Sequence, residues 1–147
     1  MSIRMVDITL KHEVYREAVA EGKIKLQNRT LELIRSGKVE KGDVLSASQI
    51  AAILAVKRTP DLIPLCHPIP ITHVNVEWFY GDDYLGVRVT VRTTAKTGAE
   101  MEALTGVLVA LLNVWDMVKR YEKDEKGQYP YTLIYDVKVI RKAKQEV

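Results

Sequence analysis

Alternating apolar and polar positions mark two stretches in the middle of the chain, residues 71–80 and 84–93. Both are rich in β-branched and aromatic residues, which favour strands, and residues 81–83 (GDD) between them are typical of a hairpin turn. Every second residue from Val87 to Val91 is valine, whereas the residues between them are polar. Because side chains alternate across a strand, the pattern predicts one face in the core and the other facing water or another subunit.

Helical patterns lie on both sides of this hairpin. A short helix is predicted from Thr30 to Arg35, closed by Gly37. Residues 46–49 (SASQ) have the spacing of a capping box and predict a second helix, which must end near Thr59 because Pro60 disfavours helix in the residue before it.

A second capping box, residues 97–100 (TGAE), predicts the start of a long helix that continues to about Tyr121. From Ala103 to Leu112 this helix is apolar nearly all round. A helix without a polar face is predicted to be central and buried.

Residues 14–26 and 132–140 read as the first and last strands, so the order is strand, two helices, hairpin, long helix, strand. That order predicts an α+β fold, a ferredoxin-like antiparallel sheet with helices packed on one face. We expect a single domain over residues 1–147, with residues 1–12 mobile. The Pro-rich stretch from Pro60 to Pro70 is interpreted as a buried loop within that domain.

Composition narrows the class of protein. The formal net charge of +3 is far from the strongly basic balance of nucleic-acid binders, although it suits an anionic small molecule. A single cysteine, Cys66, excludes an intrachain disulfide and favours a reducing compartment. No apolar run is expected to reach the roughly 20 residues of a membrane span, and the start lacks a signal peptide's apolar core. We therefore expect a cytoplasmic protein without a membrane or nucleic-acid partner.

The segment LIPLCHPIP, residues 62–70, is the first candidate for chemistry. Its three prolines restrict the backbone around Cys66 and His67, which makes His67 a candidate hydrogen-bond donor or acid/base group. The alternative is a buried loop whose histidine only bonds a carbonyl group.

Carboxylates at the two ends of the long helix are the next candidates. Glu100 could simply close the capping box, whereas capping does not require Glu102. Asp116 and Lys119 share a helix face at i, i+3 spacing. They are either an exposed ion pair or a carboxylate and an amine poised for proton transfer, for which a lowered pKa of Lys119 would be best.

Scattered basic residues could together bind a polyphosphate, although each alone is typical of a solvated surface. They are Arg16, Lys41, Lys57 and Arg58. The chain has no Gly-rich P-loop, and the three histidines and one cysteine lack metal-site spacing. No cofactor or metal is predicted, and assistance by Mg²⁺ is left open.

Several segments resemble the signature stretches of the MoaC family, the cyclic pyranopterin monophosphate synthases of molybdenum cofactor biosynthesis. They are MVDIT (5–9), Arg16, KGDVL (41–45), AVKRTPDLIPLCHPIPI (55–71), KTGAEMEAL (96–104) and VWDMVKR (114–120). Their order and spacing agree over about residues 5–121, and the pairing of LIPLCHP with TGAEMEAL is highly specific.

The resemblance implies a lyase that converts 3′,8-cyclo-7,8-dihydroguanosine 5′-triphosphate to cyclic pyranopterin monophosphate and diphosphate. It also implies a ferredoxin-like homo-oligomer, commonly a hexamer built as a trimer of dimers. By position, the resemblance implies that the catalytic residues are Asp116 and Lys119. It implies further active-site residues at Lys41, His67, Glu100 and Glu102, substrate contacts at Leu65, Cys66, His67, Met101 and Glu102, and phosphate contacts at Arg16 and Lys57.

The chain departs from the family pattern at two places. Many members end in a Gly-rich tail with lysines, whereas this chain ends IRKAKQEV, and Lys142 is our choice over Lys144 for the equivalent lysine. Val114 and the bulky Trp115 replace small residues before Asp116. Neither change removes a proposed catalytic group.

If Glu102 and Asp116 act in one reaction on a compact ligand, as the resemblance implies, their positions predict a site shared by two chains. They are fourteen residues apart on one helix, which is about 21 Å along its axis. We expect one chain to supply residues 65–67 and 101–102 and its neighbour to supply Asp116 and Lys119.

Two other classes remain open on the residues alone. A zinc-dependent pterin-forming cyclohydrolase would need several Cys or His ligands, which this chain lacks. A ferredoxin-like RNA-binding module or small regulator would display aromatic residues on its sheet, and Phe79 is the only phenylalanine.

Overall fold

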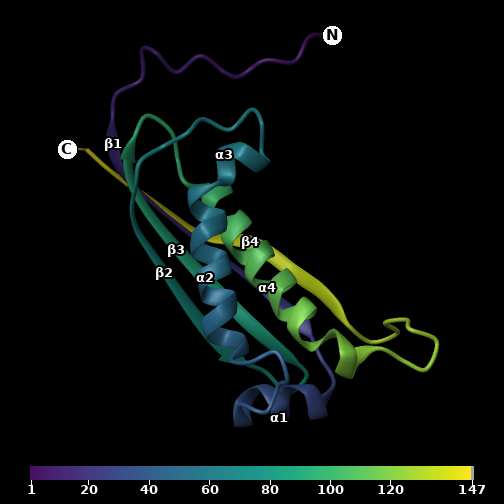
Figure 1. Ribbon diagram of the computed structural model, residues 1–147. Helices are drawn as coiled ribbons and strands as arrows, with labels where there is room; N and C mark the ends of the chain where they lie inside the picture. Colours follow the sequence, from purple (N-terminus) through teal and green to yellow (C-terminus); the bar gives the residue numbers. More distant parts are fainter. Residues whose placement is uncertain (147) are drawn as a thin grey trace.

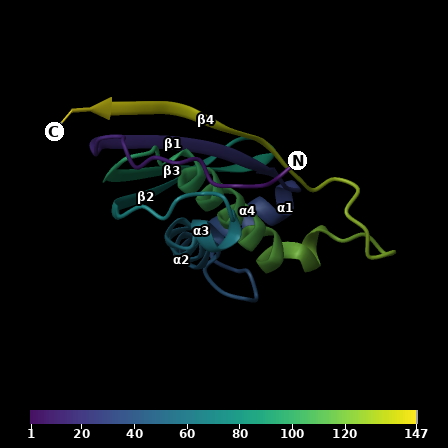
Figure 2. The same ribbon diagram turned by 90° about the horizontal axis from the view of Figure 1, so that it is seen from above.

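A computed structural model, which describes residues 1–146, has one four-stranded antiparallel sheet with helices on a single face (Figures 1 and 2). The elements are β1 (Val14–Lys25), α1 (Asn28–Ser36), α2 (Val44–Lys57), α3 (Thr59–Leu62), β2 (Ile71–Tyr80), β3 (Tyr84–Ala95), α4 (Glu100–Glu122) and β4 (Leu133–Gln145). The strand order is β2-β3-β1-β4. This βαββαβ arrangement confirms the predicted α+β, ferredoxin-like fold.

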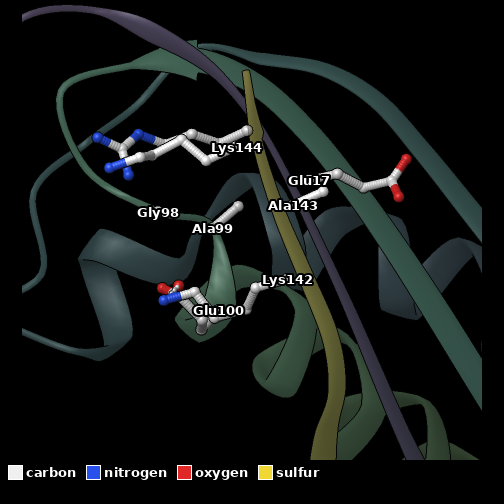
Figure 3. Close-up of a pocket in the computed structure, with 8 residues that line it drawn as sticks. Glu17, Gly98, Ala99, Glu100, Lys142, Ala143 and Lys144 are labelled. Atoms are coloured by element: carbon white, nitrogen blue, oxygen red, sulfur yellow. Dashed lines mark ion pairs between the residues drawn. The ribbon is translucent and has the colours of Figure 1, made fainter. Parts of the chain in front are cut away.

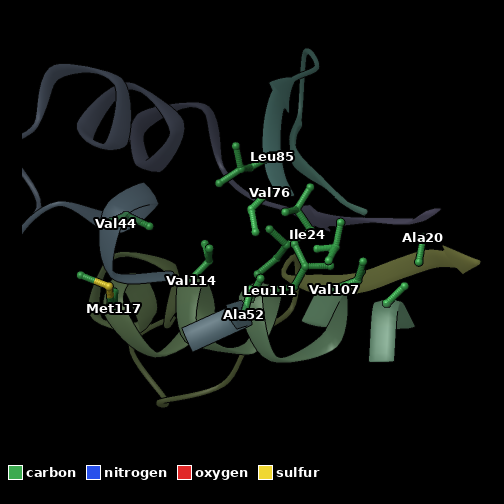
Figure 4. Close-up of a cluster of buried hydrophobic side chains, with 14 of the residues drawn as sticks. Ala20, Ile24, Val44, Ala52, Val76, Leu85, Val107, Leu111, Val114 and Met117 are labelled. Atoms are coloured by element: carbon green, nitrogen blue, oxygen red, sulfur yellow. The ribbon is translucent and has the colours of Figure 1, made fainter. Parts of the chain in front are cut away.

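The central hairpin is confirmed with its predicted faces. β2 and β3 pair antiparallel across residues 81–83, and the valines of β3 are fully buried. They belong to the core cluster in which Leu85 of β3 joins Val107 and Leu111 of α4 (Figure 4). The alternate residues face the uncovered side of the sheet, where Arg88 pairs with Glu21 and Arg92 with Glu17. That face therefore carries ion pairs between neighbouring strands, and no helix of residues 1–146 packs on it.

The predicted helix starts are wrong at both capping boxes. α2 begins at Val44, and the Asp43 side chain, not a serine, accepts the backbone N–H of Ser46 at 3.1 Å. α4 begins at Glu100 after Ala99, without a side-chain cap. A carboxylate three residues before a free backbone N–H is an equally good cap, and the sequence spacing alone did not distinguish the two. The Gly37 terminator of α1 is confirmed, with φ of 69°.

Of two predictions of burial, the one for the Pro-rich loop is wrong and the one for α4 is confirmed only in part. The Pro-rich loop is largely exposed, with Leu62 at 57% and Leu65 at 44%, because it runs over the end of the helices instead of beneath them. α4 is buried only where α2 and the sheet cover it, and Leu108 and Leu112 on its remaining side are 47% and 61% exposed. An exposed apolar stripe of this kind is typical of surfaces that contact another molecule.

α4 is long and apolar enough to span a membrane by length and composition, contrary to the sequence prediction. Its position explains that composition. Val107, Ala110 and Leu111 are completely buried against the sheet, as expected of the core helix of an α+β domain.

The last strand is longer than predicted. β4 continues beyond Ile140 to Gln145 and pairs with β1, so that Lys144 lies opposite Arg16. The C-terminal segment, which differs from the family's Gly-rich tail, is thus part of the edge strand. It brings basic residues from the two ends of the chain together.

Gly22 lies where β1 passes closest to α4, and we expect Gly22→Ala to destabilise the fold by about 1–3 kcal/mol. A Cβ there would lie 2.7 Å from Val107 Cγ1 and 2.9 Å from Val137 Cγ2. Urea denaturation measures the loss. Val107→Ala in the same chain should recover part of it, because it removes one of the two clashes; strictly additive losses in this double-mutant cycle would contradict the contact.

Candidate active site

A hollow of about 490 Å³ opens at the start of α4, between the Pro-rich loop and the N-terminal segment. It is lined by Val6, Asp7, Ile8, Lys11, Ile63, Leu65, Cys66, His67, Thr97, Gly98, Glu100 and Met101. The structure therefore gathers five predicted site residues, which lie in two segments more than 30 positions apart in the sequence. They are Leu65, Cys66, His67, Glu100 and Met101.

The N-terminal segment lies across the mouth of this hollow. The carbonyl oxygen of Val6 is 2.7 Å from His67 Nε2, and Lys96 Nζ donates to the Thr9 carbonyl at 3.3 Å. The alternative for His67, a buried loop whose histidine bonds a carbonyl group, is thus confirmed for the carbonyl contact and wrong for the burial of the loop. The partner carbonyl belongs to an exposed segment, however, so a ligand can compete for the imidazole.

A second, smaller hollow of about 230 Å³ adjoins the first and is basic (Figure 3). Arg16, Lys142 and Lys144 line it, and Gly98 and Glu100 belong to both hollows. Arg16 is fixed by donating to the carbonyl oxygens of Ala95 and Lys96. Glu100 and Glu17 also line this cavity, so its cations exceed its carboxylates by one, an arrangement that suits an anionic group.

Lys142 and Glu100 meet in this second hollow, with Nζ and Oε1 2.7 Å apart (Figure 3). Burial is the largest single influence and raises the pKa of Glu100, but the hydrogen bonds from Lys142 and from the backbone, together with the charges of Lys142 and Arg16, outweigh it, so the pKa is lowered. Glu100 is therefore a carboxylate that orients a lysine, and not the capping residue that its sequence position predicted. The contact also places Lys142, the lysine chosen from the tail, inside the candidate site.

Glu102 is almost completely buried, with 1% of its surface exposed. Its Oε2 accepts a hydrogen bond from Cys66 Sγ at 3.7 Å, while Oε1 has no partner. Burial raises the pKa of this carboxyl group above its usual value. Glu102 thus reaches the first hollow through Cys66 rather than by lining it.

A third group of predicted residues lies at the other end of α4. Asp116 Oδ1 is 3.0 Å from Lys119 Nζ, and its Oδ2 is 3.2 Å from Lys41 Nζ. Hydrogen bonds from Lys119 and Lys41 hold the pKa of Asp116 below its usual value. The same bond to Asp116 raises the pKa of Lys119, contrary to the lowered pKa that would suit an amine base. Lys119 is accordingly charged, as a proton donor or an anion ligand must be.

The two ends of α4 are separate within one chain. The helix runs without a break from Glu100 to Glu122, so Glu102 and Asp116 are about 21 Å apart along its axis, as predicted. One chain therefore holds the His67 hollow and the Asp116 cluster as two halves that do not meet.

One residue that the sequence predicted for the site lies outside the three groups, and other residues that line the first hollow were not predicted. Lys57 is exposed in the last turn of α2 and lines neither hollow as the structure describes them. Asp7, Lys11 and Thr97 line the first hollow but were not predicted individually. Asp7 and Thr97 lie in the segments MVDIT and KTGAEMEAL, so a signal for them was present.

The arrangement suits proton transfer on an anionic, compact ligand. It combines a histidine and a buried carboxyl group beside a cavity, a basic cavity next to it, and a lysine–carboxylate pair elsewhere on the surface. Across residues 1–146, no three His, Cys, Asp or Glu side chains lie close enough together to hold a metal ion.

The chain is similar to known proteins over nearly its whole length. The MoaC family model matches residues 5–145. A probable cyclic pyranopterin monophosphate synthase of Pyrococcus furiosus is 59% identical over 144 residues, covering 98% of this chain and 92% of that protein. One of Aeropyrum pernix is 62% identical, covering 95% and 96%. A relative from Methanothermobacter thermautotrophicus, 58% identical over 99% of this chain and 91% of its own, is named a probable accessory protein of that synthase.

Proposed function

Because this chain belongs to the MoaC family, we propose that it is a cyclic pyranopterin monophosphate synthase acting in molybdenum cofactor biosynthesis. Its substrate is 3′,8-cyclo-7,8-dihydroguanosine 5′-triphosphate, and its products are cyclic pyranopterin monophosphate and diphosphate. The reaction opens and rebuilds a ring, which requires several proton transfers, and closes a cyclic phosphate as diphosphate leaves.

The observation that carries this proposal is the pair of adjoining hollows at the start of α4. The larger one, with His67 and Met101, takes the ring that is rebuilt. The basic one, with Arg16 and Lys142, takes the phosphates, since a triphosphate needs several cations to neutralise it. Sharing Glu100 and Gly98, the two hollows are close enough for one nucleotide-derived ligand to occupy both.

A second copy of the chain completes the site. Asp116, Lys119 and Lys41 are needed beside the ring, but their own chain holds them at the far end of α4. The exposed apolar stripes of α2 (Ile50, Leu54) and α4 (Leu108, Leu112) support a subunit contact along these helices. A two-fold dimer then contains two equivalent sites, each made from both chains, and three such dimers would form the expected hexamer.

The chemical roles follow from the charges. Lys119, whose pKa is raised by Asp116, delivers a proton or holds a developing anion, and Asp116 keeps it charged and oriented. The imidazole of His67 exchanges the Val6 carbonyl for a polar group on the ring. Lys57, which lines neither hollow in one chain, remains a proposed phosphate ligand from the rim. No redox cofactor enters this scheme, and a cytoplasmic location accords with the single reduced cysteine.

Purified protein is expected to release diphosphate from the cyclic dihydroguanosine triphosphate without added reductant or organic cofactor, because ring opening, rebuilding and phosphate closure are proton and phosphoryl transfers. Enzyme-coupled diphosphate detection, with chromatography of the pyranopterin, measures it. GTP serves as the control and should release none. A folded, oligomeric preparation that leaves the authentic substrate intact would contradict the proposed activity and favour an accessory role, after which one relative is named.

A further inference from the structure

Cys66 and Glu102 form a contact between the Pro-rich loop and the first turn of α4. The thiol belongs to the wall of the larger hollow, whereas the carboxyl group lies behind it with 1% of Glu102 exposed. The Sγ–Oε2 distance of 3.7 Å is within reach of a hydrogen bond from sulfur, and the other acceptor near the thiol, the backbone carbonyl oxygen of His67, is neutral and lies 3.8 Å away. The thiol is thus the only side chain with a hydrogen bond to Glu102 among the described residues.

Glu102 also has a carboxyl oxygen whose hydrogen bonding is incomplete. Its Oε1 is buried without any hydrogen-bond partner, and orphaned buried oxygens are rare and tend to mark sites that a ligand or water completes. Packing confines this buried side chain, and the contact of Oε2 with the Cys66 thiol is its one hydrogen bond to another side chain among the described residues.

We propose that Cys66 is a positioning residue for Glu102: its thiol, in the wall of the hollow, fixes the buried carboxyl group behind that wall and couples it to a ligand bound in the hollow. This inference rests on the proposed function for the identity of the ligand, the ring that is rebuilt. It assigns to Cys66 a role through Glu102 instead of a direct chemical one, with the protonated thiol as the working form.

The electrostatics of the pair accord with a thiol that donates and does not attack. Burial, followed by the negative charge of Glu102, raises the pKa of Cys66 to about 11. In turn, the thiol hydrogen bond favours the ionised form of Glu102, against the larger effect of burial. The other ionisable group that acts on both is Glu100 on the same helix; His67, Asp7 and Lys11 line the same hollow.

The contact can be tested without substrate, because Cys66 is the single cysteine of the chain. The rate of its alkylation by iodoacetamide is measured against pH in the wild type, in Glu102→Gln and in the matched control Glu100→Gln. Removing the adjacent charge should lower the thiol pKa. At pH values below the thiol pKa, each unit by which that pKa falls should speed alkylation about threefold, because the gain in thiolate exceeds the loss in nucleophilicity. Glu100→Gln should change it less. Equal profiles for Glu102→Gln and the wild type would overturn the proposal.

The second test uses Cys66→Ala and Cys66→Ser, which leave Glu102 in place should Glu102→Gln fail to fold. The alanine variant removes the donor, so the pKa of Glu102, read from the NMR shift of its side-chain carboxyl carbon, should rise; the serine variant should return it towards the wild-type value. In the plot of kcat/KM against pH, the limb that reports the ionisation of Glu102 should move to higher pH in the alanine variant and back in the serine variant.

If Cys66 only touches the ligand, both variants would change KM while the Glu102 titration stays fixed, and the proposal would be wrong. Absence of any turnover in wild-type protein would contradict the proposed function alone, because the alkylation and NMR results do not depend on it.

Discussion

Lys119→Ala is expected to lower turnover by about 10²–10⁴-fold while the fold survives. The ammonium group is 44% exposed at the surface of α4, so its loss removes little buried area and should barely change stability. Its hydrogen bond to Asp116 keeps the ammonium group charged. In the alanine variant, neither the proton nor the positive charge that the reaction needs is supplied. An ion pair of merely structural use at this exposure would be worth less than about 1 kcal/mol.

The matched control is Lys123→Ala, one turn further along and also exposed, which removes the same charge away from Asp116. Steady-state kinetics on both variants, with urea denaturation to verify folding, separates the two cases. Turnover of Lys119→Ala close to that of Lys123→Ala would return Asp116 and Lys119 to an exposed ion pair.

Chains carrying Asp116→Ala and chains carrying His67→Ala should each be nearly inactive alone, yet active when refolded together. Each variant removes one half of the proposed site, and the two halves lie at opposite ends of a continuous helix. In a mixed dimer both defects fall in one site, so the other site is intact. Co-purification of two differently tagged chains verifies the mixing before activity is measured.

Local patterns predicted most of the fold. Period-two alternation in 84–93 and the turn before it were sufficient for the hairpin, and Gly37 alone marked the end of α1, because these signals act over a few residues. The capping boxes were misleading because Asp43, an equally good cap, precedes Ser46. The exposure of Leu108 and Leu112 could not be foreseen, since which side of an apolar helix is covered depends on α2 and the sheet.

The candidate site was predictable in its residue types but not in its pairings. The segments containing His67 and Glu100 were identified from sequence, whereas the contact of Glu100 with Lys142 depends on β4 running back beside β1. The charge on Lys119 depends likewise on how closely Asp116 approaches it. Sequence spacing shows that two groups share a helix face, but pKa directions follow from tertiary distances.

The most direct test of the shared site is the activity of mixed Asp116→Ala and His67→Ala chains as a function of their ratio. With random pairing, half of the dimers in an equal mixture are mixed and each holds one intact site of two, so activity should rise from near zero to about a quarter of wild type and fall again symmetrically. Verified mixed oligomers that stay as inactive as either parent at every ratio would show that the site lies within one chain.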